Sequence, residues 1–184
     1  ETTGFSYMND RIIEIGAVKV VGGQIVDRFS TFINPGMPIP LEIEKLTGIN
    51  DAMVADARDI TQVLPEFMEF CQGCMMVAHN AEFDMSFIRY NCEQQGISRD
   101  FVTVDTLGIA RALLPDLKNY KLDTVVEAMD CVLENHHRAV DDAEATAHVF
   151  VKFIERLKKR DVCDLTALNA MSSMSVHAIQ KARS

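Results

Sequence analysis

An imidazole and a carboxylate stand close together in the last third of the chain. His137 precedes Asp142 by five residues, and apolar residues follow Asp142 at steps of four and three. This spacing is typical of a helix with one face in the core, so it places Asp142 in a first turn. The helix dipole favours a carboxylate there, and a histidine in the preceding loop is free to approach it. The pair therefore suits a metal ligand beside a proton acceptor.

Two alternatives stay open for this stretch. In the first, Asp141 or Asp142 simply caps the helix, and both histidines are exposed to solvent. The second concerns the choice of histidine, because His136 stands in the same relation to Asp141 as His137 does to Asp142. The spacing alone does not distinguish these interpretations.

Another carboxylate, Asp84, also stands near an expected helix start. The wholly apolar run 75–78 predicts a short buried strand. This strand leads into His79 and Asn80 and then into a helix that carries Asp84 near its beginning. Asp84 and Asp142 are therefore both expected near the first turn of a helix.

The rest of the chain must position these residues. A β-branched run over 11–21 and an alternating run up to Ile33 predict a hairpin that turns at Gly22 and Gly23. The elements expected after it are a helix over 41–46 ending at Gly48, a helix from Thr61 to Cys71 with Pro65 in its first turn, a strand over 101–104, a helix capped by Asp105 and Thr106, and a helix over 122–129. This order predicts an α/β domain with a mixed central β-sheet flanked by helices.

Composition narrows the class of protein. The 184 residues are 48% hydrophobic and carry a formal net charge of −9. A real core is therefore expected, and a broad basic groove that grips nucleic acid by counterion release is excluded. A nucleic-acid enzyme is compatible with this charge if cations lie between its carboxylates and the phosphates. The sequence has no membrane-spanning run or signal-peptide pattern, and its five scattered cysteines fit reduced thiols, so a cytoplasmic protein is expected.

Several segments together resemble a known family, the DEDD superfamily of 3′–5′ exonucleases. The matching segments, in family order, are 1–4, 46–49, 79–84, 104–107 and 137–142. The doubled histidine within 134–139 looks most like the proofreading exonuclease domain of PolC-type DNA polymerase III alpha subunits. The resemblance covers residues 1–157 and implies a ribonuclease H-like fold.

By resemblance, three carboxylates are expected to hold two divalent cations, Mg²⁺ or Mn²⁺, and one histidine to act as the general base. These residues are Glu1, Asp84 and Asp142 as metal ligands and His137 as the base. A second subfamily has a tyrosine where this chain has Arg138, which supports the histidine version. Ala139 matches the alanine two residues after the family histidine, and so selects His137 over His136.

The resemblance also implies a pocket around the last nucleotide of a single-stranded 3′ end of DNA. Its expected lining residues are Thr2, Thr3, Gly4, Phe5, Leu46, Thr47, His79 and Asn80. Gly4 would let the main chain approach, and Phe5 or Leu46 would stack on or wedge a base. The alternative gives structural roles to these residues, with Asn80 as a helix cap and with His79 and Phe5 in the core.

The family pattern also extends beyond the chain. Its first aspartate would lie two residues before Glu1, at the end of an apolar strand, so unpaired sheet edges are expected to be exposed or filled by a neighbouring chain. Residues 1–160 are expected to form the exonuclease domain, and 161–184 a linker or docking tail toward the remainder of a polymerase chain and its replisome, with no membrane partner. An RNA-trimming exonuclease and a non-catalytic docking domain are the alternative functions.

Overall fold

The computed structural model describes residues 1–133, 138–159, 167 and 170. His136 and His137 lie outside the described residues, as does the expected tail 161–184 apart from its two described positions. The elements in chain order are β1 (Glu14–Val21), β2 (Gln24–Phe32), α1 (Leu41–Thr47), α2 (Asp51–Val54), α3 (Ile60–Phe70), β3 (Met76–Ala78), α4 (Ala81–Gln94), β4 (Thr103–Asp105), α5 (Thr106–Leu113), α6 (Leu122–Ala128) and α7 (Ala139–Lys158). The expected order of strands and helices is confirmed, and the short helix α2 is an addition to it.

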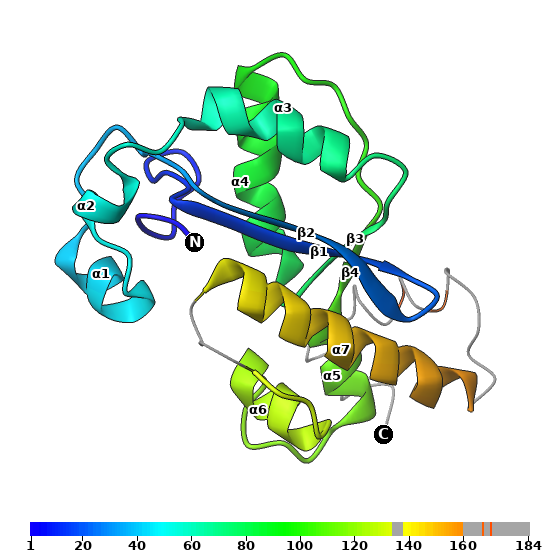
Figure 1. Ribbon diagram of the computed structural model, residues 1–184. Coiled ribbons are helices and arrows are strands. Elements are labelled where there is room, and N and C mark those ends of the chain that lie inside the picture. The colour runs from blue at the N-terminus through cyan, green and yellow to red at the C-terminus, as the bar shows by residue number, and fades with distance from the viewer. Residues whose placement is uncertain (134–137, 160–166, 168–169, 171–184) are drawn as a thin grey trace.

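β1 and β2 pair antiparallel and form the long hairpin that crosses the molecule in Figure 1. Gly22 and Gly23 make its turn with φ angles of 59° and 82°, in the left-handed region that favours glycine. The hairpin and its turn, both predicted from the sequence, are confirmed. The register of the pairing shifts between Lys19 and Val20, close to the turn.

The other two strands form a sheet of their own. β3 pairs parallel with β4, so that Met76 lies opposite Thr103 and Ala78 opposite Asp105. The strands of the described residues therefore lie in two two-stranded sheets, and they do not form the single mixed sheet that was expected. A cavity of about 940 Å³ is lined by residues of both β1 and β3.

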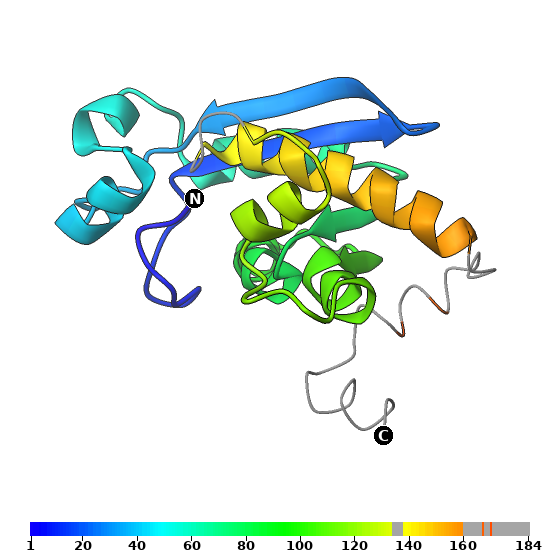
Figure 2. The same cartoon turned by 90° about the horizontal axis from the view of Figure 1, so that it is seen from below.

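α7 lies along the hairpin, with α5 and α6 on its other side (Figures 1 and 2). Its close approach to β1 depends on Gly16, because a Cβ there would come within 2.1 Å of the Ala139 carbonyl carbon and the Val140 nitrogen. On the opposite face of α7, Val149 and Phe153 are fully buried in a cluster shared with α5 and α6. The helix is thus fixed between the hairpin and the lower helices.

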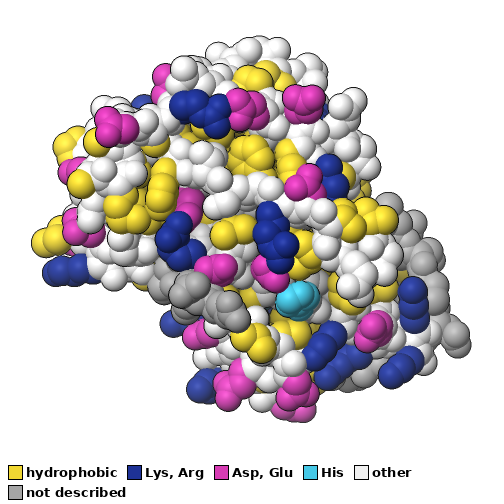
Figure 3. Space-filling model, viewed as in Figure 1, with side chains coloured by type: hydrophobic (Ala, Val, Ile, Leu, Met, Phe, Trp, Pro, Cys, Tyr) yellow, Lys and Arg dark blue, Asp and Glu magenta, His cyan; other side chains and the backbone are white. Residues whose placement is uncertain are grey.

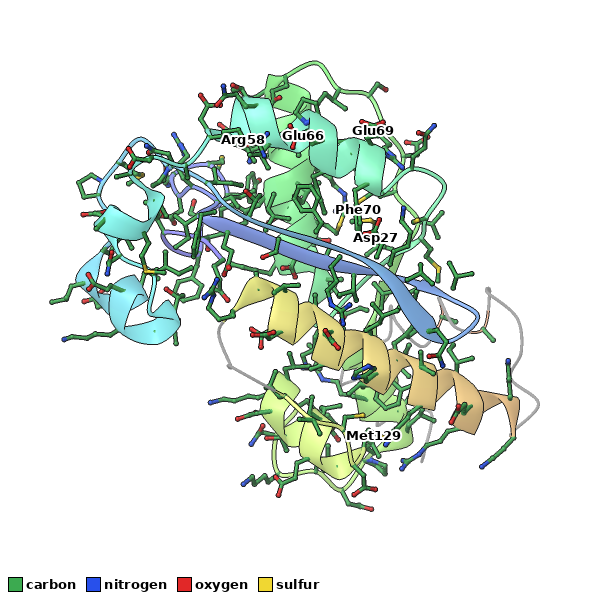
Figure 4. The ribbon with its side chains drawn as sticks, in the orientation of Figure 1. Asp27, Arg58, Glu66, Glu69, Phe70 and Met129 are labelled. Atoms are coloured by element: carbon green, nitrogen blue, oxygen red, sulfur yellow. The ribbon has the colours of Figure 1, made fainter. Side chains whose placement is uncertain are left out.

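Three hydrophobic clusters form the core. The first packs α3 and α4 against the hairpin, and Phe29 of β2 contacts Phe67 of α3 with ring centroids 5.3 Å apart. The second joins β4, α5, α6 and α7 and includes Met129, which lies below α7 in Figure 4. The third, smaller cluster lies under α1 and α2 and consists of Ile13, Ile39, Ile43, Ile49 and Val54.

Local polar signals set several helix limits. Asp59 forms a capping box at the start of α3, and the Asp105 side chain caps α5. α3 begins at Ile60, one residue before its expected start, so Pro65 lies in the second turn and its predicted place in the first turn is wrong. Gly48, with a φ of 72°, ends α1 as expected. Among the described residues, no helix is long and apolar enough to cross a membrane.

Candidate active site

Three carboxylates from distant parts of the sequence line one cavity. Glu1, Asp84 and Asp142 all belong to the wall of the 940 Å³ cavity that β1, β3 and α7 also line. Their oxygen atoms are the donors that hard cations such as Mg²⁺ and Mn²⁺ prefer. In the described part of the chain, no three His, Cys, Asp or Glu residues are already gathered closely enough to hold one ion. The carboxylate oxygens thus suit divalent cations, and all three carboxylates lie on the wall of the same cavity.

Glu1 is held beside the start of β1 by main-chain hydrogen bonds. Its nitrogen donates to the Glu14 carbonyl at 2.8 Å, and its own carbonyl accepts from the Ile13 N–H at 2.9 Å. Thr2 continues this antiparallel pairing opposite Ile12. The main chain of Glu1 is therefore fixed relative to β1.

Asp84 is the fourth residue of α4, which confirms its expected place near a helix start. Its side chain is open to the cavity, yet the protein atoms around it desolvate the charge and raise the pKa of the carboxyl to about 6. The carboxylates of Glu1 and Asp105 add to this rise of the pKa, and a hydrogen bond to the main chain of Asp84 opposes it. A proton and a cation would therefore compete for Asp84, because metal ligands bind as carboxylates.

Asp142 is the fourth residue of α7, because that helix begins at Ala139. The N-cap residue is Arg138, and its carbonyl accepts from the N–H groups of Asp141 and Asp142, both at 3.0 Å. The alternative in which Asp141 or Asp142 caps the helix is therefore wrong. His137, the expected base, lies outside the described residues, so its role stays a prediction.

His79 is engaged by protein groups at both ring nitrogens. Nε2 lies 2.7 Å from the Tyr120 carbonyl and Nδ1 lies 2.9 Å from the Thr106 hydroxyl. A carbonyl only accepts, so Nε2 carries the proton. In the neutral imidazole Nδ1 is then an acceptor for the Thr106 hydroxyl, whose other acceptor is the Ala78 carbonyl at 3.3 Å. Burial lowers the pKa of His79, which favours this neutral form. These contacts support the structural alternative, in which the side chain is satisfied inside the protein.

Asn80 starts α4 with a left-handed backbone, at a φ of 68°, and its side chain makes no capping hydrogen bond. Asn80 therefore occupies the N-cap position, as the structural alternative expected, and its carbonyl accepts from the Phe83 N–H at 3.0 Å, but its side chain takes no part in the cap. The Asn80 N–H instead donates to the Asp105 carboxylate at 2.9 Å, and the same oxygen accepts from the Leu107 N–H at 2.9 Å. Asp105 thus ties the start of α4 to the start of α5. Sequence reasoning gave Asp105 only the second of these contacts, although the segment 104–107 already stood out.

Two threonines of the expected substrate pocket have internal partners. Thr3 is buried, and its hydroxyl accepts from the Arg11 N–H at 2.9 Å. Thr47 is also buried, and its hydroxyl donates to the Ile43 carbonyl at 2.8 Å. Both hydroxyls thus stabilise their own segments, and neither residue lines the 940 Å³ cavity, whereas Thr2 and His79 do.

The apolar members of the expected pocket are exposed. Phe5 is 79% exposed and Leu46 is 47% exposed, so the alternative that buried Phe5 in the core is wrong. The Phe5 ring lies 6.2 Å from that of Phe83 on α4. In the same loop, the Thr2 hydroxyl donates to the Gly4 carbonyl at 2.6 Å, and a Cβ at Gly4 would meet the Asp10 carboxylate at 2.5 Å. The absence of a side chain at Gly4 therefore serves the loop's own packing.

The surface charge agrees with the net charge of −9. On the face shown in Figure 3, Lys and Arg side chains are scattered among Asp, Glu and apolar side chains. A ligand on this face would meet both signs of charge and exposed apolar groups, rather than a broad basic area.

Residues 1–150 match the family model described as exonuclease. The PolC-type DNA polymerase III of Caldanaerobacter subterraneus subsp. tengcongensis is 50% identical over 171 residues, and that of Clostridium perfringens is 49% identical over 170 residues. These matches cover 93% and 92% of this chain, whereas the chain spans only 12% of the length of either relative.

Among solved structures, exonuclease X in complex with 5′ overhanging duplex DNA is similar, with a TM-score of 0.74 and 25% sequence identity. The alignment covers 94% of this chain and 96% of that chain. The expected ribonuclease H-like α/β fold is thereby confirmed. Since the family model covers residues 1–150, the chain belongs to the exonuclease family, as the resemblance of its motifs to the DEDD exonucleases implied.

Proposed function

We propose that this chain removes nucleotides one at a time from the single-stranded 3′ end of DNA, as the proofreading part of a PolC-type DNA polymerase III. The observation that carries the proposal is that Glu1, Asp84 and Asp142 all line one cavity, in a chain of the exonuclease family. Half of the residues are identical to a PolC-type relative over 171 positions, which favours the polymerase context.

In this proposal Glu1, Asp84 and Asp142 hold two divalent cations, Mg²⁺ or Mn²⁺. When bound, such cations polarise the attacking water and neutralise charge on the departing 3′ oxygen. His137 accepts the proton of that water, and a neutral imidazole is suited to this near neutral pH. Asp84 must lose its own proton to bind a cation, and its pKa of about 6 permits this at neutral pH.

Binding of the DNA end rests on stacking more than on a basic surface. Phe5 is an exposed aromatic ring, and stacking on such a ring tolerates every base, while the exposed apolar side chain of Leu46 can wedge against a base. Thr2 and the main chain at Gly4 lie beside Phe5 in sequence, Thr47 follows Leu46, and Thr3, Thr47, His79 and Asn80 hold the surrounding segments. The cations then offset the repulsion between phosphates and the acidic chain.

The proposed exonuclease domain covers residues 1–160, and 161–184 would be a linker or docking tail toward the remainder of the polymerase chain and its replisome. The relatives support such a context, because this chain matches only 12% of their length. A cytoplasmic place for the protein agrees with the chemistry of DNA replication in bacteria, the source of these relatives.

Digestion of end-labelled oligonucleotides tests the proposal. The natural protein that contains this chain is incubated with single-stranded DNA or RNA, in Mg²⁺, in Mn²⁺ or in a chelator. We expect a ladder of products that shortens from the 3′ end of DNA, requires a divalent cation, and disappears in Asp84→Asn and Asp142→Asn. Release from the 5′ end, internal cleavage or activity in the chelator would contradict the proposal, and faster digestion of RNA would shift it to an RNA-trimming enzyme.

A further inference from the structure

We propose that Glu14 is a positioning residue that couples two of the proposed metal ligands, Glu1 and Asp142. The inference rests on the proposed function and adds to it a residue with no assigned role. Glu14 is the first residue of β1, and its charged side chain is only 1% exposed. A buried carboxylate is costly unless its oxygens are fully hydrogen-bonded, so its partners show what it serves.

The side chain of Glu14 binds the start of α7. Oε1 accepts from Arg138 Nε at 3.2 Å and from its terminal nitrogen at 2.9 Å, and Oε2 accepts from the Ala139 N–H at 3.0 Å. The first N–H groups of a helix have no partner within it, and Arg138 supplies no side-chain cap. The carboxylate of Glu14 therefore takes the place of a cap, from a residue more than 120 positions earlier in the chain.

The main chain of Glu14 binds Glu1. Its carbonyl accepts from the Glu1 nitrogen at 2.8 Å, and its N–H donates to the Glu1 carbonyl at 3.3 Å. On the other side, the Arg138 carbonyl accepts from the Asp142 N–H at 3.0 Å. Glu14 thus holds the backbone of one proposed ligand directly and reaches the backbone of the other through a single residue.

Neighbouring groups restrict this arrangement further. Gly16, two residues along β1, lacks the Cβ that would collide with Ala139, so the first turn of α7 lies directly on the strand. The Arg138 guanidinium also lies 5.0 Å from the centroid of the Phe32 ring on β2. We define Glu14, Gly16, Arg138 and Ala139 as the helix seat.

A second ion pair between the hairpin and α7 provides a matched control. Arg28 of β2 pairs with Glu144 of α7 at 2.8 Å, but the two side chains are 53% and 33% exposed. Exposed pairs contribute little to stability or geometry. Glu144→Gln therefore makes the same chemical change on the same helix, without touching the helix seat.

The experiment compares Glu14→Gln with Glu144→Gln in the natural protein. The readouts are kcat and KM on 3′-labelled single-stranded DNA, Mn²⁺ binding without DNA by electron paramagnetic resonance, and hydrogen exchange at the Ala139 amide. In Glu14→Gln we expect kcat to fall about a hundredfold with KM changed less than about threefold, because a misplacement of about 1 Å has this effect. Mn²⁺ affinity should fall about tenfold and exchange at Ala139 should become faster. Glu144→Gln should leave all these quantities unchanged.

Arg138→Lys is the second variant, because it keeps the positive charge and one donor and so disturbs folding less. Its losses of kcat and Mn²⁺ affinity should lie between those of the wild type and Glu14→Gln. If Glu14→Gln does not fold, Arg138→Lys tests whether the bond between Glu14 and Arg138 positions the proposed ligands. The inference would be overturned if Glu14→Gln or Arg138→Lys folded and kept the kcat and Mn²⁺ affinity of the wild type. It would also be overturned if Glu144→Gln lost as much kcat and Mn²⁺ affinity as Glu14→Gln. If the wild-type protein neither binds Mn²⁺ nor releases nucleotides, the proposed function fails. The rate of hydrogen exchange at the Ala139 amide would still show, by comparison of Glu14→Gln with the wild type, whether Glu14 holds the start of α7.

Discussion

His79 shows how burial determines the state of a single side chain. Its pKa lies below the usual 6.5 because burial disfavours the imidazolium, while the hydrogen bond to Tyr120 and the charge of Asp105 act in the opposite direction. Below pH 6.5 the unfolded chain therefore takes up a proton that the folded chain resists. The stabilising effect of neutral His79 is complete above pH 6.5 and is lost as the pH falls through the lowered pKa.

We expect this loss to appear in the free energy of unfolding. Urea denaturation at a series of pH values should show a decline below pH 6.5 in the stability of the wild type relative to His79→Gln, because the opposite effect of the raised pKa of Asp84 is the same in both proteins. His148→Gln is the control, because His148 is exposed on α7. A decline that His148→Gln reduces as much as His79→Gln does would show that His79 is not its source.

His137 is predicted to accept a proton without binding a cation. His137→Ala should lower kcat by roughly a hundredfold, the usual contribution of a general base, and leave Mn²⁺ affinity nearly intact. At a saturating Mn²⁺ concentration, which keeps Asp84 deprotonated, the wild-type rate should fall as the pH drops through the histidine pKa, and this acidic limb should vanish in the variant. Rate measurements from pH 5 to 9 would check both points. His136→Ala is the control, and the assignment fails if that variant alone loses activity.

Phe5 is predicted to bind a base by stacking. Because its side chain is 79% exposed, Phe5→Ala should leave the unfolding midpoint unchanged. It should raise KM for single-stranded DNA by about tenfold, since one stacked base contributes about 1–3 kcal/mol. Steady-state kinetics on short oligonucleotides would measure this change. Val132→Ala truncates another exposed apolar side chain, 67% exposed, and an equal rise of KM there would count against a specific role for Phe5.

At the scale of elements, the contact between β1 and α7 is the tightest restriction. A methyl group at Gly16 would lie 2.1 Å from main-chain atoms of α7, and main-chain atoms cannot rotate away as a flexible side chain can. The strand and the helix would have to separate. Glu1, which is bonded to β1, would then move away from Asp142 on α7.

Gly16→Ala should therefore destabilise the fold by about 3 kcal/mol, at the upper end of overpacking changes. The matched control is Gly36→Ala, because a Cβ at Gly36 would meet no atom within 4 Å. The φ of 66° at this position should lower the free energy of unfolding of that variant by about 1 kcal/mol. Chemical denaturation of both variants measures the difference. Equal losses of stability would mean that α7 can move off β1 without penalty.

At the scale of the whole molecule, the described strands are divided between two small sheets. In the described residues, β3 pairs only with β4, and β1 beyond Glu14, which also bonds to Glu1, pairs only with β2. Both strands line the 940 Å³ cavity. Strand edges that lack a partner are sites where another extended segment adds to a sheet.

We therefore expect the 184-residue chain to associate with itself or to unfold at modest temperature. Light scattering after gel filtration should show species larger than the 20.6 kDa monomer, in proportions that rise with protein concentration. Mutation of Val18 to Lys, in the middle of β1, places a charge beside the cavity and should reduce this association. A monodisperse monomer at high concentration, with a high unfolding midpoint, would contradict this expectation.

The sequence by itself determined the elements whose signals are local. Gly22 and Gly23 predicted the hairpin turn, Gly48 the end of α1, and Asp105 the start of α5, because each signal acts through atoms a few residues away. The order of the motifs along the chain also indicated the family, because these motifs contain the residue types that the family's reaction requires. Helix starts placed Asp84 and Asp142 in first turns for the same local reason.

The tertiary structure alone decided which residues hold these elements together. Nothing near Glu14 in the sequence indicates its bonds to Arg138 and Ala139, because the partners are more than 120 positions away and meet only after α7 packs on β1. The internal partners of His79 are likewise supplied by distant segments, at Thr106 and Tyr120. Periodicity and caps report contacts within one element, whereas the position of a carboxylate at a cavity depends on packing between elements.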